Sequence, residues 1–300
     1  MSSLNAHQQR QLAALALVLS GLLLSSAGLV IRQLEQADGY DVTFWRSVGC
    51  VTLVAIVLFV RSGAGWIGQT FRGGWVMLAS GCCWAVMFTC FSVALSLTTV
   101  AKALVLIALS PLIAALTAWL FLSEQIPART WLAILIAGAG VGWMISDGLG
   151  ADPDLPLSNW GMLIAAGVPI GFALNFVLLK RHQHRIDLLP AVALGAVISC
   201  AVMLPVVFPV QATPSDIAWM LGLGVFQIGI PCSIIVLTAK YLAPQEAALL
   251  LLLEVVCGPL WVWLGVGEEP SSATLWGGAL VVSALVVNEW LSIRQTARTT

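Results

Sequence analysis

Ionisable side chains are scarce in the long apolar stretches of this 300-residue chain, so the few that occur there are the first candidates for chemistry. Glu254 follows a run of leucines and precedes Val255 and Val256. A charge at the centre of a membrane-spanning helix costs about 2.5–3.5 kcal/mol on insertion scales. The Glu254 carboxylate can bind an ammonium group or carry a coupling proton. A permanent structural pair with Arg46 or Lys102, or hydrogen bonds from a broken backbone, would explain it equally well.

Two basic residues share this setting. Arg46 stands four residues inside the predicted second apolar segment, and Lys102 opens the fourth. Either can attract a carboxylate, Arg46 through bidentate hydrogen bonds and Lys102 as a point charge. Both can instead extend to the membrane surface and keep their charge in water. This second interpretation is favoured for Lys102, whereas the two are balanced for Arg46.

Two amides and one indole complete the candidate set. Asn175 and Gln227 lie within the sixth and eighth apolar segments, where an amide suits a zwitterionic ligand or an interhelical hydrogen bond equally well. Among the deep tryptophans, packing or lipid-facing roles are the more common. Trp84 is favoured for stacking on a ligand because small residues surround it between Ser80 and Ala85. The candidate substrate-binding residues are therefore Glu254, Arg46, Lys102, Trp84, Asn175 and Gln227.

No pattern in the chain points to catalysis or to a bound cofactor. The seven cysteines lie in apolar segments without metal-ligand spacing and are interpreted as packing residues. His182 and His184 fall in a basic loop and supply too few ligands for a metal site. A phosphate-binding loop, a nucleophile constellation and a Rossmann glycine fingerprint are all missing from the sequence. We expect no catalytic residue, no metal and no cofactor.

The elements that position these residues follow from the composition. Only 9% of the residues are charged and 60% are apolar, whereas about 25% charged residues is usual for a soluble domain. The chain is therefore expected to be an integral membrane protein. A net charge of −1 without a basic cluster argues against nucleic-acid binding.

Apolar runs predict ten membrane spans joined by short links, which leaves no room for a soluble catalytic domain. The runs lack the strict alternation of barrel strands, so we expect an all-α helix bundle. The first run is too long for a secretory signal and is interpreted as a retained helix. The predicted spans are 12–31, 42–60, 75–97, 103–122, 129–146, 160–179, 189–209, 217–238, 247–265 and 273–291.

Basic residues predict the orientation of these spans. Ten of the thirteen Lys and Arg residues fall on one side, which is expected to be cytoplasmic and to hold both termini. Only Arg32 and Lys102 lie on the other side, and Arg46 falls within a span. We expect a multi-pass protein of the cell inner membrane, with a monomer as the working assumption. The ten residues are Arg10, Arg61, Arg72, Arg129, Lys180, Arg181, Arg185, Lys240, Arg294 and Arg298.

A weak internal repeat appears when the chain is shifted by 144 residues. Glu124 is then expected on the inner side and Glu268 on the outer side, because five spans per half is an odd number. The sequence thus predicts two inverted five-helix repeats, 1–148 and 159–300, joined by a linker at 149–158. The shift aligns Leu116, Trp119, Leu120, Glu124 and Thr130 with Leu260, Trp263, Leu264, Glu268 and Thr274.

The segment Ala101–Glu124 contains Ser-Pro-Leu-Ile-Ala-Ala-Leu and ends in Leu-Phe-Leu-Ser-Glu. It resembles the fourth-helix signature of the EamA family in the drug/metabolite transporter superfamily. Phe44-Trp45-Arg46 and the segment Leu253–Trp263 show the same resemblance, which is greatest to the YddG-type aromatic amino-acid exporters. It implies ten helices, inverted halves and movement of small metabolites.

The chain departs from the family pattern at two places. Ser123-Glu124 stands where the family usually has Gly-Glu. Glu254-Val255 stands opposite Ser110-Pro111, with the proline of the second half at 259 instead. We therefore expect the two halves to break their helices at different depths.

Taken together, these features favour a secondary transporter that exports small metabolites by alternating access through a central midplane cavity. Amino acids, including aromatic ones, are the expected substrates. The alternative is a broad-specificity drug/metabolite efflux carrier with proton coupling; a membrane-embedded enzyme or a nonspecific channel is less favoured. The expected partners are a small-molecule substrate and the lipid bilayer.

Overall fold

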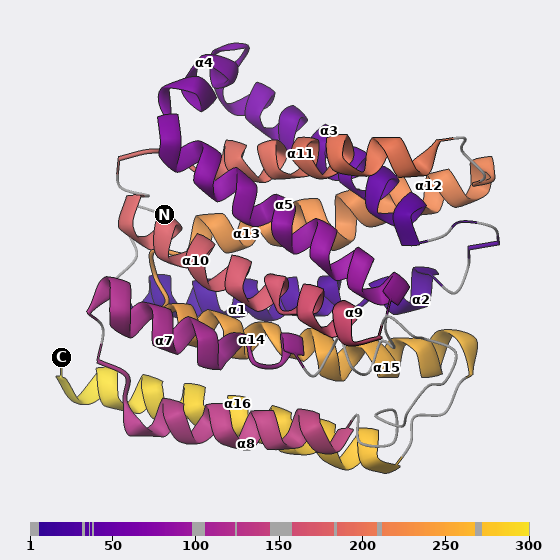
Figure 1. The fold of residues 1–300 in the computed structure, drawn as a ribbon. Coiled ribbons are helices and arrows are strands. Elements are labelled where there is room, and N and C mark those ends of the chain that lie inside the picture. Colours follow the sequence, from indigo (N-terminus) through magenta and orange to yellow (C-terminus); the bar gives the residue numbers. More distant parts are fainter. Residues whose placement is uncertain are drawn as a thin grey trace.

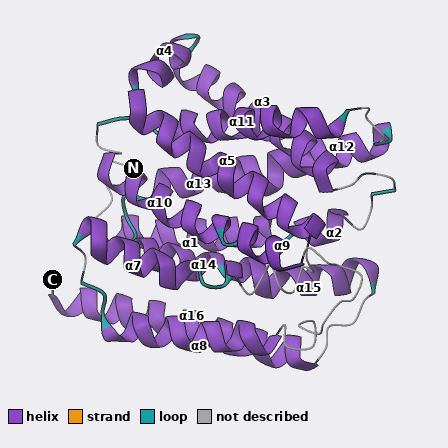
Figure 2. Cartoon of the chain, viewed as in Figure 1, coloured by secondary structure: helices purple, strands orange, loops and turns teal. Residues whose placement is uncertain are grey.

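The computed structural model describes residues 6–31, 34–35, 37, 39–97, 106–123, 125–144, 158–182, 185–208, 212–267 and 272–299. Helices dominate this part of the chain, and the residues described contain no strand (Figure 2). The elongated helices lie side by side as one bundle (Figure 1). Lys102, Glu124, Glu268 and all but Ser158 of the predicted linker 149–158 lie outside the described residues.

The helices of the first part are α1 (Ala6–Leu24), α2 (Ala27–Ile31), α3 (Gly39–Ser62), α4 (Gly65–Arg72), α5 (Gly74–Leu97), α7 (Ser110–Leu122) and α8 (Ala128–Met144). Those of the second part are α9 (Ser158–Ala165), α10 (Gly167–His182), α11 (Leu189–Val207), α12 (Pro214–Leu223), the π-helix η2 (Gly224–Gly229), α13 (Ile230–Thr238), α14 (Pro244–Leu251), α15 (Leu253–Val266) and α16 (Ser272–Thr299).

Six helical stretches in the described residues are long and apolar enough to cross a membrane. Shorter apolar helices stand at three more predicted spans, and α1 with α2 occupies the first. Each predicted span therefore contains helix, and the chain is an all-helical membrane protein as expected. The long stretches are Gly39–Ser62, Gly74–Ala94, Trp160–His182, Leu189–Val207, Pro214–Thr238 and Pro244–Gly265.

One helix was not predicted. α4 follows α3 after a short turn, and its eight residues are too few to span a membrane. Ile67 and Phe71 are exposed, whereas Trp66 packs against the main core. In Figure 1 this helix lies at the same end of the bundle as both chain termini. Termini at one end agree with an even number of crossings.

The packing of the helices repeats between the two parts of the chain. α3 contacts α11, α7 contacts α14, and α8 contacts α16, so corresponding spans of the two parts meet. Three further large contacts have counterparts: α5 with α11 corresponds to α3 with α12 and η2, α5 with α10 to α1 with α13, and α7 with α10 to α1 with α14. Exchanging the two parts therefore preserves the main helix contacts, as expected of a duplicated fold.

The helix breaks also correspond, which corrects the expectation that they would lie at different depths. α7 begins at Ser110 after a turn at Ala108 and Leu109, and α15 begins at Leu253 after a turn at Leu252. The amide of Leu109 donates to the Leu106 carbonyl at 3.1 Å, and the amide of Leu252 donates to the Leu249 carbonyl at 3.1 Å. Tight i→i+3 bonds of this kind mark both breaks. Pro111 stands in the first turn of α7, whereas the break before α15 has no proline beside it. The placement of Pro259 was therefore a poor guide.

Two glycines bring α3 into backbone contact with α12 and η2. A Cβ atom added to Gly224 would lie 2.1 Å from the Arg46 carbonyl oxygen, and one added to Gly49 would lie 2.3 Å from the Leu221 carbonyl oxygen. Small residues permit such close crossings of membrane helices. The crossing holds Arg46 on α3 next to Gln227 on η2.

Candidate substrate-binding cavity

A central cavity lies among helices of both parts of the chain. Its walls come from α1, α3, α5 and the start of α7, and from α10, η2, α13, α14 and α15. The space open to the centres of water molecules is about 130 Å³. This corresponds to roughly ten waters, or ~300 Å³ of liquid, which suits one small metabolite.

Arg46 is one of two charged residues that line the cavity in the described part of the chain. Its side chain is only 3% exposed. Nη1 donates to Gln227 Oε1 at 3.4 Å and Nη2 donates to Ser92 Oγ at 3.3 Å, both longer than the usual N–H···O range. The guanidinium carbon lies 5.7 Å from the centroid of the Phe91 ring. Arg46 therefore does not extend to the membrane surface, and two long bonds to neutral oxygens leave its charge poorly compensated.

Gln227 holds this arginine in place rather than standing free. Its Oε1 accepts from Arg46, and its Nε2 donates to the Leu24 carbonyl at 3.1 Å, where α1 ends. Gln227 occurs in the π-helix η2, a wider turn that is frequent at functional sites. The amide thereby links α3, η2 and the end of α1 around one wall of the cavity.

Glu254 lines the cavity from the first turn of α15. The N-terminus of a helix favours a negative charge. Among the described residues no ion pair joins Glu254 to Arg46, although the two charges attract each other. The direct pair with Arg46, one of the structural interpretations, is therefore not formed, and the pair with Lys102 lies outside the described residues.

The rest of the cavity wall is largely apolar and aromatic. Trp84, Met87, Phe88 and Phe91 line it from one face of α5, and Phe172 lines it from α10. The Trp84 and Phe88 rings stack with centroids 5.7 Å apart. Trp84 is 1% exposed, and the structure gives its indole N–H no hydrogen-bond partner. Gly195 of α11 makes room for it, because an added Cβ there would lie 2.3 Å from the Trp84 Cβ.

Asn175 does not join the other candidates at the cavity lining. Its side chain is buried, and its Oδ1 accepts from Ser80 Oγ at 2.6 Å, which links α10 to α5. This is the interhelical bond that the sequence offered as one of two explanations. Lys102 lies outside the described residues.

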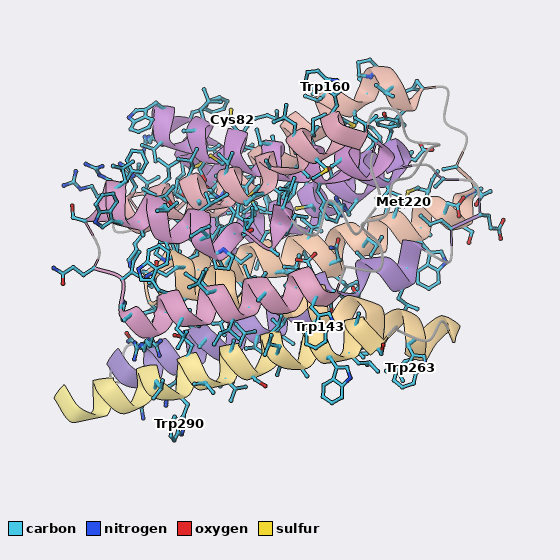
Figure 3. All side chains as sticks on the ribbon, turned by 60° about the horizontal axis from the view of Figure 1, so that its bottom comes forward. Cys82, Trp143, Trp160, Met220, Trp263 and Trp290 are labelled. Atoms are coloured by element: carbon cyan, nitrogen blue, oxygen red, sulfur yellow. The ribbon has the colours of Figure 1, made fainter. Side chains whose placement is uncertain are left out.

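The other deep tryptophans face away from the core. Trp119 is 63% exposed and Trp143 is 53% exposed. Trp263 points outward from the bundle, as do Trp160 and Trp290 near the ends of their spans (Figure 3). Trp261 is partly covered, and its Nε1 donates to Ser25 Oγ at 2.7 Å. Among the deep tryptophans of the described residues, Trp84 is the one that lines the cavity.

Sequence reasoning missed the phenylalanines of the cavity and Ser92. A signal was present, because Trp84, Met87, Phe88 and Phe91 have the i, i+3, i+4, i+7 spacing of one helix face. In an apolar chain such spacing is too common to separate a cavity wall from core. Within the described residues no group of three or more His, Cys, Asp or Glu side chains is arranged to hold a metal ion.

The cavity thus presents a cation, an anion and an aromatic wall to a space the size of a metabolite. Such an arrangement can bind and orient a small amphipathic molecule. Among the described residues, neither Arg46 nor Glu254 is paired with a second group in the way that nucleophilic or metal-assisted catalysis requires.

Comparison with known proteins places the chain among transporters. The EamA-like transporter family matches residues 11–146 and 159–289. An uncharacterized transporter of Archaeoglobus fulgidus is 24% identical over 278 residues, which cover 91% of this chain and 94% of that protein. The uncharacterized transporter YdfC of Bacillus subtilis is 26% identical over 185 residues, which cover 60% of this chain and 59% of that protein.

A solved crystal structure shares the fold, with a TM-score of 0.78 over 95% of this chain and 99% of that chain at 18% sequence identity. The family match covers both parts of the chain and stops on either side of the predicted linker. Two family domains, an all-helical fold and long apolar helices lead to one conclusion. The chain belongs to the EamA-like transporter family and is a multi-pass membrane transporter, not an enzyme.

Proposed function

We propose that this transporter exports small metabolites, principally amino acids including aromatic ones, as a secondary carrier. The observation that carries the proposal is the placement of Arg46 and Glu254 on one aromatic cavity without an ion pair between them. An α-amino acid brings one carboxylate and one ammonium group, which can satisfy both side chains. The resemblance to YddG-type exporters supports the same substrates and the outward direction.

Alternating access is the proposed mechanism. It requires two similar halves that can rock around a central site. The matched helix neighbours support this arrangement, and ten crossings with five in each half would make the second half inverted in the membrane. The proposed halves are 1–148 and 159–300, with the linker at 149–158.

The proposed location is the cell inner membrane, with both termini in the cytoplasm. Basic residues at the end of the bundle that holds the termini support this orientation. The carrier is proposed to act as a monomer, because each chain contributes both halves of its cavity.

Counterflow in proteoliposomes tests the proposal. Vesicles are loaded with unlabelled phenylalanine, and uptake of labelled phenylalanine, tryptophan, methionine and threonine is followed. A carrier gives saturable uptake that the internal substrate accelerates and that competing amino acids inhibit. Linear uptake without competition would indicate a channel and would contradict alternating access.

One observation favours a second candidate, broad-specificity efflux coupled to protons. Glu254 is a carboxylate at the cavity without an ion-pair partner among the described residues, and such groups carry protons in many transporters. Under this alternative a pH gradient drives concentrative uptake, and Glu254→Gln abolishes the effect of the gradient. Transport that ignores the gradient in the wild type, or that keeps its pH dependence in Glu254→Gln, contradicts proton coupling through this residue.

A further inference from the structure

We infer that the cavity binds a neutral α-amino acid in one fixed orientation, with its carboxylate at Arg46, its ammonium group at Glu254 and its side chain along the aromatic face of α5. The inference deepens the proposed function, because it defines which amino acids fit and which end meets which residue.

The carboxylate end follows from the state of Arg46. Both hydrogen bonds of its guanidinium are long and go to neutral oxygens, at 3.4 Å to Gln227 and 3.3 Å to Ser92. A carboxylate forms shorter, charge-assisted bonds of about 2.7–2.9 Å with arginine. Exchanging the two neutral partners for a carboxylate is therefore favourable, and Gln227 remains anchored to the Leu24 carbonyl at 3.1 Å.

The ammonium end follows from Glu254. This carboxylate comes from α15 whereas Arg46 comes from α3, so the two charges stand on different walls of one cavity. A zwitterion compensates both. A ligand with only one charge leaves the opposite wall charge buried without a partner, which costs far more than an exposed charge.

The direction of the ligand side chain follows from the aromatic face. Phe91 lies 5.7 Å below the Arg46 guanidinium carbon, so the carboxylate end is at the Phe91 end of that face. The face continues through Phe88 to Trp84, a rise of roughly 10 Å along α5. Phe172 of α10 lines the same cavity. A large apolar side chain therefore extends from Arg46 towards Trp84.

Selectivity against charged side chains follows from the same lining. Among the described lining residues Arg46 and Glu254 are the ionic groups, and the amino acid backbone uses both. A third charge on the substrate would meet Trp84, Phe88 or Phe172. Glutamate and lysine are therefore expected to bind on the order of 100-fold more weakly than phenylalanine.

A charge-matched set of ligands tests the orientation. Phenylalanine carries both charges, phenethylamine carries only the ammonium group, and 3-phenylpropionate carries only the carboxylate. Binding to the purified full-length protein in detergent is measured by isothermal calorimetry. The wild type is expected to bind phenylalanine on the order of 100-fold more tightly than either analogue.

Two variants are expected to remove the preference for phenylalanine over one of the singly charged analogues. Glu254→Gln is expected to bind 3-phenylpropionate at least as well as phenylalanine, and Arg46→Gln is expected to bind phenethylamine at least as well as phenylalanine. Arg46→Lys serves as the second variant if Arg46→Gln does not fold, because it keeps the cation and should keep the wild-type order of the three ligands.

A matched pair on α10 tests the side-chain subsite. Phe172 lines the cavity, whereas Phe176 lies one turn away in the buried core and does not line it. Phe172→Ala should reduce the preference for phenylalanine over alanine by about tenfold. Phe176→Ala should lower thermal stability and leave that ratio unchanged.

Each result bears on the inference. Equal weakening of all three ligands by Glu254→Gln and Arg46→Gln would overturn it, because both residues would then be structural. The reverse pairing of variants and analogues would overturn the orientation. If the wild type binds none of the three ligands, the proposed amino-acid function fails as well. If it binds phenylalanine but the preferences do not exchange, only the present inference fails.

Discussion

Gly224→Ala gives the sharpest prediction about how the fold positions Arg46. The added Cβ would lie 2.1 Å from the Arg46 carbonyl oxygen, 2.7 Å from Gly49 Cα and 2.9 Å from the Cys50 amide nitrogen. Carbon atoms in contact need about 3.5–4.0 Å. All three neighbours are backbone atoms, which cannot rotate aside, so α3 and η2 must separate by more than about 1 Å.

The separation has two costs. Overpacking of a core typically destabilises a protein by about 1–3 kcal/mol, and a backbone-to-backbone clash belongs at the upper end of that range. Arg46 moves with α3, and its bonds to Gln227 and Ser92 are already 3.4 and 3.3 Å long. A shift of this size takes them out of hydrogen-bond range. We expect the affinity for phenylalanine to fall by about tenfold or more, as for the loss of one charged hydrogen bond.

Gly222→Ala is the matched control, because nothing lies within 4 Å of its added Cβ. Helix propensity favours alanine over glycine by about 1 kcal/mol, so the control should be as stable as the wild type or more stable. Thermal unfolding in detergent, followed by tryptophan fluorescence, should give Gly224→Ala a midpoint several degrees below Gly222→Ala. Counterflow should show the loss of affinity only in Gly224→Ala. Equal midpoints and equal affinities would refute the close crossing as the element that positions Arg46.

Three further predictions follow. Arg10→Glu and Glu246→Arg should each destabilise the protein by about 1–2 kcal/mol, because the two side chains are mostly buried and pair at 3.3 Å. The double variant should recover most of this loss in thermal unfolding. No recovery would contradict the pairing. Asn175→Leu should lower stability by about 0.6–2 kcal/mol, because the hydrogen bond to Ser80 is lost. The affinity for phenylalanine, measured by calorimetry, should stay unchanged. A lower affinity would place Asn175 in the binding site after all. Trp119→Leu should change neither stability nor counterflow kinetics, because Trp119 is 63% exposed on the outer surface of the bundle; slower transport would contradict a lipid-facing role.

Much of the helical framework could be predicted from the sequence because membrane helices obey strong constraints. The scarcity of charges and the length of the apolar runs placed a helix at every expected span. The resemblance carried by Ser110–Glu124 led to the correct family. The short helix α4 was missed because its eight residues have no long apolar run.

The candidate site was harder to predict, because chain position does not show which way a side chain points. Arg46 and Glu254 could be found as charges in apolar runs, yet their lack of a direct pair depends on the packing of α3 and α15. Asn175 and Gln227 are equivalent in sequence terms, but only Gln227 lies at the cavity. The helix break at Leu252 was misjudged because a backbone turn interrupts that helix without a proline beside it, whereas Pro111 directly follows the corresponding turn before α7.

The position of a bound amino acid would show whether Arg46, Glu254 and the aromatic face of α5 form the binding site. We would determine the structure of the transporter with 4-iodo-L-phenylalanine and locate the iodine by its anomalous scattering. We expect one iodine peak beside Trp84 and Phe172, with the ligand carboxylate at Arg46 and its ammonium group at Glu254. An iodine peak outside this cavity, or a ligand bound with its charged ends reversed, would contradict this expectation.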